Sequence, residues 1–145
     1  MSLSELGSFV AETRYDDLPD EVVEQAKLHL LDTIGCGLLG WQINVYRPFL
    51  ELIRDLDTKK ESSVFGEQWK GTCLNASFIN TVMINSTDYE GTHRASVSHP
   101  AAIIIPAALA LGERERADGK AVIEAMVVGY ECFGRVATSV NPSHM

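Results

Sequence analysis

Six side chains suited to acid–base chemistry lie within the twelve residues from Asp88 to His99. They are two carboxylates, a hydroxyl, two imidazoles and a guanidinium, namely Asp88, Glu90, Thr92, His93, Arg94 and His99. General acid–base catalysis at neutral pH uses such a mixture, in which one group accepts a proton, another donates one, and a cation or donor holds the substrate. The stretch therefore predicts a site for proton transfer on a small molecule.

The position of His99 favours an anionic ligand. Pro100 suits the first turn of a helix that starts near Ala101, and the unpaired N–H groups of a helix N-terminus readily bind a carboxylate. The chain has a formal net charge of −8, yet no Asp or Glu occurs between Gly91 and Gly112. We therefore expect the carboxylate of Asp88 and the imidazole of His99 to form a cradle for an organic anion.

Structural roles are also compatible with these residues. Asp88 could end its helix or hydrogen-bond a turn. Glu90 fits a solvated loop acid, residues 92–94 fit an exposed polar segment, and His99 fits a simple helix entry. The sequence contains no nucleophile elbow, P-loop, dinucleotide-binding fingerprint or metal-binding helix. The residues permit acid–base chemistry without requiring it.

The elements that must position these side chains are helices. Apolar periodicity and capping residues predict helices over residues 4–13, 19–39, 48–57, 72–87, 101–113 and 118–139. Ser4, Thr72 and Asp118 are the expected N-caps, and residues 63–66 form the one credible strand. An all-α fold in a single domain, residues 1–145, follows. In the last helix we expect the buried face to carry Val122, Ala125, Gly129, Cys132 and Val136.

Composition excludes several classes of protein. The chain has 12 Lys and Arg against 20 Asp and Glu, which argues against nucleic acid because phosphate binding needs clustered basic residues. Its three cysteines form no CxxC pair, so neither a metal site nor a disulfide is expected.

Its longest apolar run, Ala101 to Leu111, is too short to span a bilayer. The N-terminus lacks the features of a secretion signal, so we predict a cytoplasmic protein. The helix at Ala101 is apolar nearly all round, which predicts a homo-oligomer.

Several linked segments resemble the MmgE/PrpD family. The central ones are TDYEGTH at residues 87–93, SHPAA at 98–102 and PAALALGE at 106–113, preceded by Asn80. LPDEVVEQAK at 18–27, LDTIGCGLLG at 31–40 and GYECFGR at 129–135 are similar to flanking segments of the same family. The resemblance covers nearly the whole chain, in order and with consistent spacing.

The resemblance implies a large helical domain, a dimer formed through it, and lyase or epimerase chemistry on small di- and tricarboxylates such as 2-methylcitrate and cis-aconitate. It implies no metal and no organic cofactor. Residues of the family's pocket correspond to Asp88, Thr92 and His99, with Asp88 and His99 moving a proton next to a substrate carboxylate. Together with the charge pattern, this makes Thr92, His93 and Arg94 the predicted substrate-binding residues.

The chain also departs from the family pattern. Gly91 stands where the family has a third acid, and Ala101 replaces the usual Ser after the His-Pro pair. Family members are roughly three times as long, and the remaining pocket residues come from later segments. Two hypotheses from different classes therefore stay open, a lyase to which this chain contributes part of the site, and a catalytically silent helical module that oligomerises.

Overall fold

The computed structural model describes residues 2–140. Its elements, in chain order, are α1 (Leu3–Glu12), the 3-10 helix η1 (Tyr15–Asp17), α2 (Asp20–Ile43), α3 (Arg47–Arg54), β1 (Ser62–Ser63), β2 (Lys70–Gly71), α4 (Cys73–Asn85), α5 (Ala101–Glu115) and α6 (Gly119–Ser139). The predicted mostly helical fold is confirmed. In residues 2–140, no helix has both the length and the apolar character needed to cross a membrane.

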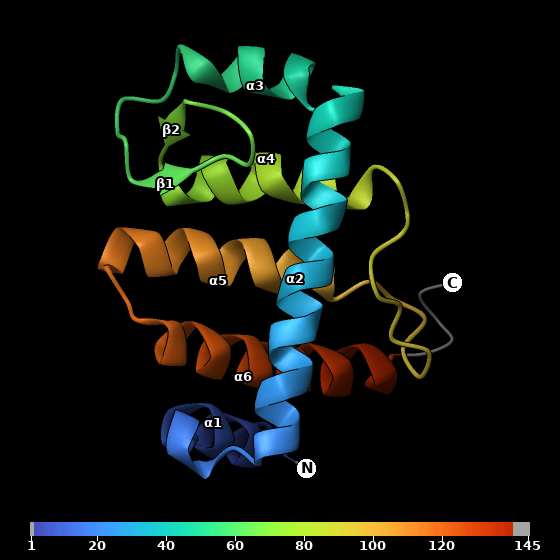
Figure 1. Cartoon of the computed structure of the whole chain (residues 1–145). Coiled ribbons are helices and arrows are strands. Elements are labelled where there is room, and N and C mark those ends of the chain that lie inside the picture. Colours follow the sequence, from blue (N-terminus) through green and yellow to red (C-terminus); the bar gives the residue numbers. More distant parts are fainter. Residues whose placement is uncertain (1, 141–145) are drawn as a thin grey trace.

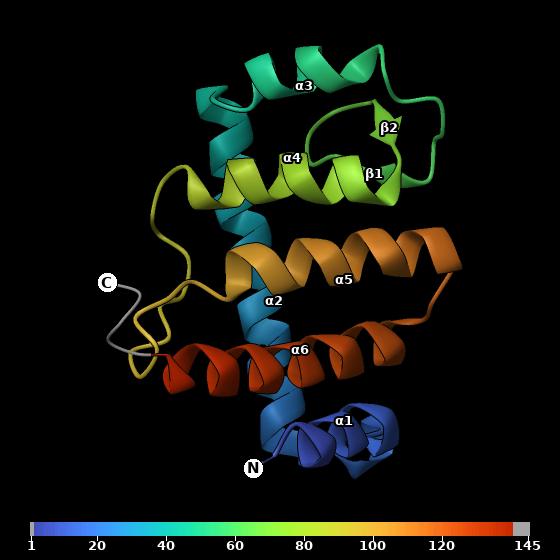
Figure 2. The same ribbon diagram turned by 180° about the vertical axis from the view of Figure 1, so that it is seen from behind.

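The helices form a layer that one long helix crosses (Figure 1). Helices α3, α4, α5 and α6 lie side by side, with α1 beyond α6, and each contacts its neighbour. Helix α2 runs across one face of the layer and contacts α4, α5 and α6 (Figure 2). The loop from α4 to α5, which carries the candidate site residues, lies at one end of the layer.

Small residues let α2 approach the layer closely. A Cβ atom at Gly40 would overlap the backbone of Met83 on α4, and one at Gly37 would overlap the ring of Phe65. Gly35 differs, because nothing lies within 4 Å of the position its Cβ would take. Two of the three glycines in this helix, Gly37 and Gly40, therefore serve close packing.

Side-chain caps explain where α1, α4 and α6 begin. The side chains of Thr72 and Asp118 accept hydrogen bonds from the third residue beyond them, as predicted. The first helix was predicted to begin at Ser4, but Ser2 is its N-cap. Ser2 Oγ accepts from the Glu5 N–H at 3.2 Å, and Glu5 Oε2 accepts from the Ser2 N–H at 2.6 Å. This reciprocal capping box needs an acid three residues after the cap, which only Ser2 has.

The sheet has one strand more than predicted. β1 overlaps the expected strand and pairs antiparallel with β2, with Ser62 opposite Gly71. Asn80 on α4 holds the segment after β1, since its amide oxygen accepts from the Phe65 N–H at 3.0 Å and its nitrogen donates to the Ser63 carbonyl at 3.1 Å. Lys70 and Gly71 show no strand pattern in the sequence, because this pairing depends on contacts with the rest of the fold.

The buried face of α6 differs from the predicted one. Ile123 and Met126 are its buried residues, and both belong to a core cluster with residues of α2 and α5. Ala125 and Val136 are exposed. The prediction was wrong for Ala125 and Val136, because α6 is apolar on more than one side and periodicity did not decide which side is covered. It holds at Gly129, where a Cβ atom would overlap Ile104 of α5.

Candidate functional site

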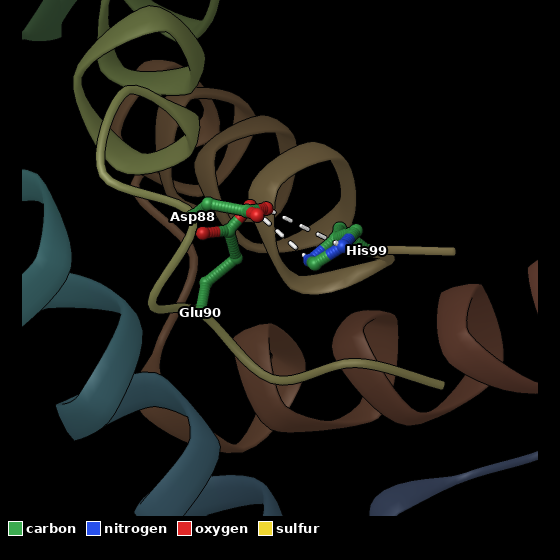
Figure 3. A group of neighbouring side chains, drawn as sticks. All are labelled: Asp88, Glu90 and His99. Carbon is green, nitrogen blue, oxygen red and sulfur yellow. Dashed lines mark ion pairs between the residues drawn. The ribbon is translucent and has the colours of Figure 1, made fainter. Parts of the chain in front are cut away.

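The loop between α4 and α5 begins with an unusual backbone conformation at Asp88. Helix α4 ends at Asn85, and the Asp88 N–H donates to the Asn85 carbonyl at 3.3 Å. Asp88 has a φ of 55°, in the left-handed region that Asp tolerates better than most residues. This turn reverses the chain, so that the Asp88 side chain faces the start of α5 (Figure 3).

His99 lies at the entrance of α5 and faces two carboxylates. It precedes Pro100, the N-cap of α5. His99 Nε2 is 3.6 Å from Asp88 Oδ1, and His99 Nδ1 is 3.5 Å from Glu90 Oε1 (Figure 3). Both distances are longer than hydrogen bonds and correspond to ion pairing when the imidazole is protonated. The two residues that the sequence placed around a cradle are therefore neighbours in space.

The two carboxylates differ strongly in exposure. The side chain of Asp88 is 81% exposed, while that of Glu90 is fully buried. Asn85, in the last turn of α4, donates from Nδ2 to Glu90 Oε1 at 2.6 Å. Glu90 is thus a buried member of the site, and interpreting it as a solvated loop acid was wrong. Its place in the family-like segment TDYEGTH is the signal that could have identified it.

The predicted substrate-binding residues occupy different surroundings. Thr92 and Arg94 are exposed on the loop. His93 is half-buried; its Nδ1 is 2.5 Å from Ser96 Oγ, and its backbone pairs with that of Ser98. The structure does not show these three side chains in contact with His99, and their substrate-binding role stays a prediction.

His93 lines a separate, mainly apolar cavity. The cavity has a volume of about 430 Å³ and lies between α1, α2 and α6. Its wall includes His29 and Tyr130, whose rings are 5.7 Å apart. Burial, together with the negative charge of Asp32, raises the pKa of Tyr130 to about 12. Tyr130 is therefore a neutral hydroxyl at physiological pH.

Within residues 2–140, one group of side chains could offer ligands to a metal ion, namely Asp88, Glu90 and His99. One ligand atom from each lies within 4.8 Å of the other two. A divalent ion such as Zn²⁺ needs ligand atoms at about 2.0–2.2 Å and usually a fourth ligand. Here the two imidazole nitrogens face different carboxylates, an arrangement that fits proton transfer and charge pairing.

The structure thus defines a class, namely a helical domain with a carboxylate–imidazole cluster where a loop enters a buried helix. In a comparison with known families, residues 4–145 match the MmgE/PrpD N-terminal domain. The chain belongs to the MmgE/PrpD family.

Curated relatives share this match at low identity. The chain is 29% identical over 144 residues to a cis-aconitate decarboxylase-like protein, oryM, of Aspergillus oryzae, covering 94% of this chain and 30% of the relative. It is 26% identical over 147 residues to the cis-aconitate decarboxylase of Aspergillus terreus, covering 98% and 30%. The cis-aconitate decarboxylase of Homo sapiens is 29% identical over 124 residues, covering 82% and 26%. The chain therefore spans less than a third of the length of these relatives.

Proposed function

We propose that this chain supplies part of the active site of a lyase that acts on a small di- or tricarboxylate such as cis-aconitate or 2-methylcitrate. The observation that carries the proposal is the pairing of His99 with Asp88 at the entrance of α5, 3.6 Å apart. An imidazole and a carboxylate in this arrangement can share and transfer a proton. Membership of a family with cis-aconitate decarboxylases among its curated relatives supports the choice of substrate class.

The exposure of the two groups suits contact with a substrate. Asp88 is open to solvent, and the His99 side chain is 31% exposed. In a dehydration, this pair would remove a proton from the carbon next to a carboxylate. The hydroxyl group on the neighbouring carbon would take up a proton and leave as water. In a decarboxylation of cis-aconitate, CO2 would leave, the electrons of the broken C–C bond would form a new double bond to the central carbon, and the electrons of the old double bond would move to its far carbon, which the pair would protonate. An epimerase of a dicarboxylate would remove a proton in the same way and return a proton to the opposite face of the same carbon.

The surroundings of the pair suit an anion. The site lies beside the N-terminus of α5, and the N–H groups at a helix N-terminus can stabilise negative charge that develops on a substrate carboxylate. We propose that Thr92, His93 and Arg94 contribute further donors from the loop. These steps use side chains of the protein, and we propose that they need neither a metal nor an organic cofactor.

The outer face of α2 supports the proposal of a homo-oligomer, which we expect to be a dimer. Leu28, Leu31 and Leu38 are exposed there and recur at helical spacing around Gly35. A stripe of this kind is suited to packing against another helix. The same surface favours the second candidate function, a silent helical module that acts through association. A cytoplasmic location stays a prediction.

Incubation of the purified chain with cis-aconitate and with 2-methylcitrate separates the two functions. In the lyase, cis-aconitate should shift the NMR signals of Asp88 and His99; the Asp88 shift should disappear in His99→Ala, and both shifts should persist in His29→Ala. Release of CO2 or loss of water would exclude the silent-module function. His99→Ala should abolish this turnover. If neither compound shifts these signals or turns over at saturating concentration, the proposed function of this chain is refuted.

A further inference from the structure

We propose that Glu90 is a positioning residue that holds the proton of the neutral His99 ring on Nδ1. Nε2 then presents its lone pair at the open side of the site. The inference rests on the proposed function for its catalytic meaning. The geometry of the folded chain carries it independently of any substrate.

Burial is the first step of the argument. A carboxylate removed from water is costly unless opposite charge and hydrogen-bond donors compensate it. Glu90 is only 2% exposed, and Oε1 receives the Asn85 amide at 2.6 Å and faces His99 Nδ1 at 3.5 Å. Within residues 2–140, the other oxygen, Oε2, has no hydrogen-bond partner. A proton on His99 Nδ1 therefore stabilises a carboxylate that is otherwise poorly compensated.

The two nitrogens of His99 have different surroundings. Nδ1 is buried and, among the described residues, Glu90 is the acceptor that faces it, without a fully formed hydrogen bond. Nε2 faces the exposed carboxylate of Asp88. Catalytic contacts are often long in a free protein and shorten when substrate binds. The buried side of the ring is thus the side of Glu90, and the accessible side is the one that would meet a substrate.

The chemical consequence is a choice of tautomer. A neutral imidazole carries one proton, on either nitrogen, and the hydrogen bond made by one nitrogen determines the state of the other. With Nδ1 protonated toward Glu90, Nε2 can accept a proton from the substrate. If Nε2 carried the proton instead, the accessible nitrogen could not act as a base. In this view Asp88 touches the reacting groups, and Glu90 acts through His99.

Long-range proton–nitrogen NMR spectra of the histidine-labelled chain can test the assignment. At a pH of about 9, above the usual imidazole pKa of about 6.5, the nitrogen shifts distinguish the two tautomers. We expect His99 to be mainly the Nδ1–H form in the wild type and mainly the Nε2–H form in Glu90→Met, which removes the acceptor. Glu90→Gln, which keeps an oxygen but removes the charge, should give an intermediate mixture.

Matched controls separate this effect from general damage to the fold. Asp88→Asn alters the carboxylate facing Nε2, so it should leave the Nδ1–H form in place. Glu51→Gln, an exposed acid on α3, should change nothing, and the signals of His29 and His93 should stay constant in every variant. Far-ultraviolet circular dichroism checks the helices of each variant.

Two results would overturn the proposal. One is an Nε2–H tautomer of His99 in the folded wild-type chain, which decides the question even if Glu90→Met does not fold. The other is an unchanged tautomer in a folded Glu90→Met variant. Neither measurement uses a substrate, so failure of the lyase proposal, seen as lack of ligand binding, is distinguishable from failure of this one.

Discussion

Replacing Asn80 by Ala should destabilise the fold strongly, because one buried amide holds two backbone groups. Asn80 is 2% exposed, and its side chain pairs with the Phe65 N–H and the Ser63 carbonyl. Each hydrogen bond contributes about 0.5–1.5 kcal/mol net, and a buried group left without a partner costs about 1–3 kcal/mol. Ser63 is exposed, so water can replace part of the loss there. We therefore expect the free energy of unfolding to fall by about 2–3 kcal/mol.

Urea denaturation followed by circular dichroism measures this loss. With a slope of about 2 kcal/mol/M, typical of a small domain, the midpoint should fall by about 1–1.5 M. Ser77→Ala is the matched control, since it removes a hydroxyl from the same helix and leaves both bonds intact. A midpoint in Asn80→Ala within about 0.2 M of the control, well below the shift expected from two lost hydrogen bonds, would refute the argument.

Two further predictions concern the packing and the acid sensitivity of the fold. Gly40→Ala should lower the free energy of unfolding by about 1–3 kcal/mol, because its Cβ would overlap the Met83 backbone; Gly35→Ala, on the open face of α2, should not, and equal thermal stability of the two would contradict the close approach. Burial alone would raise the pKa of Asp57, but hydrogen bonds from Asn75 and from Thr72 outweigh it and lower the pKa below its ordinary 3.8. This carboxylate therefore stabilises the fold above pH 3.8, and the contribution is lost as the pH falls through the lowered value. Urea midpoints measured down this pH range should fall more steeply in the wild type than in Asp57→Asn, and parallel curves would exclude the effect.

The open side of the candidate site follows from how its two acids are held. Asp88 stands in a left-handed turn with its carboxylate in solvent, and Glu90, two residues later, points into the protein. One loop thus offers His99 an exposed acid on its accessible side and a buried acid on its other side. This asymmetry lets one imidazole be both oriented by the protein and available to a ligand.

Features that depend on residues close together in the chain were predictable from the sequence. The caps at Thr72 and Asp118 act over three residues, and apolar spacing located each helix to within a few positions. The proximity of Asp88 to His99 was also predictable, because both lie in the single loop, residues 86–100, that joins α4 to α5. Family resemblance pointed to the same two residues.

Which side of each element is covered depends on contacts between elements far apart in the chain. Glu90 lies between Asn85, the last residue of α4, and His99, which precedes the N-cap of α5, a placement that no local pattern in the loop specifies. The same holds for α6, where Ile123 rather than Val122 is fully buried, since a helix with apolar residues on several sides gains its buried face only from its neighbours. Spacing along a chain fixes which residues share a face, whereas burial depends on the elements that happen to pack against that face.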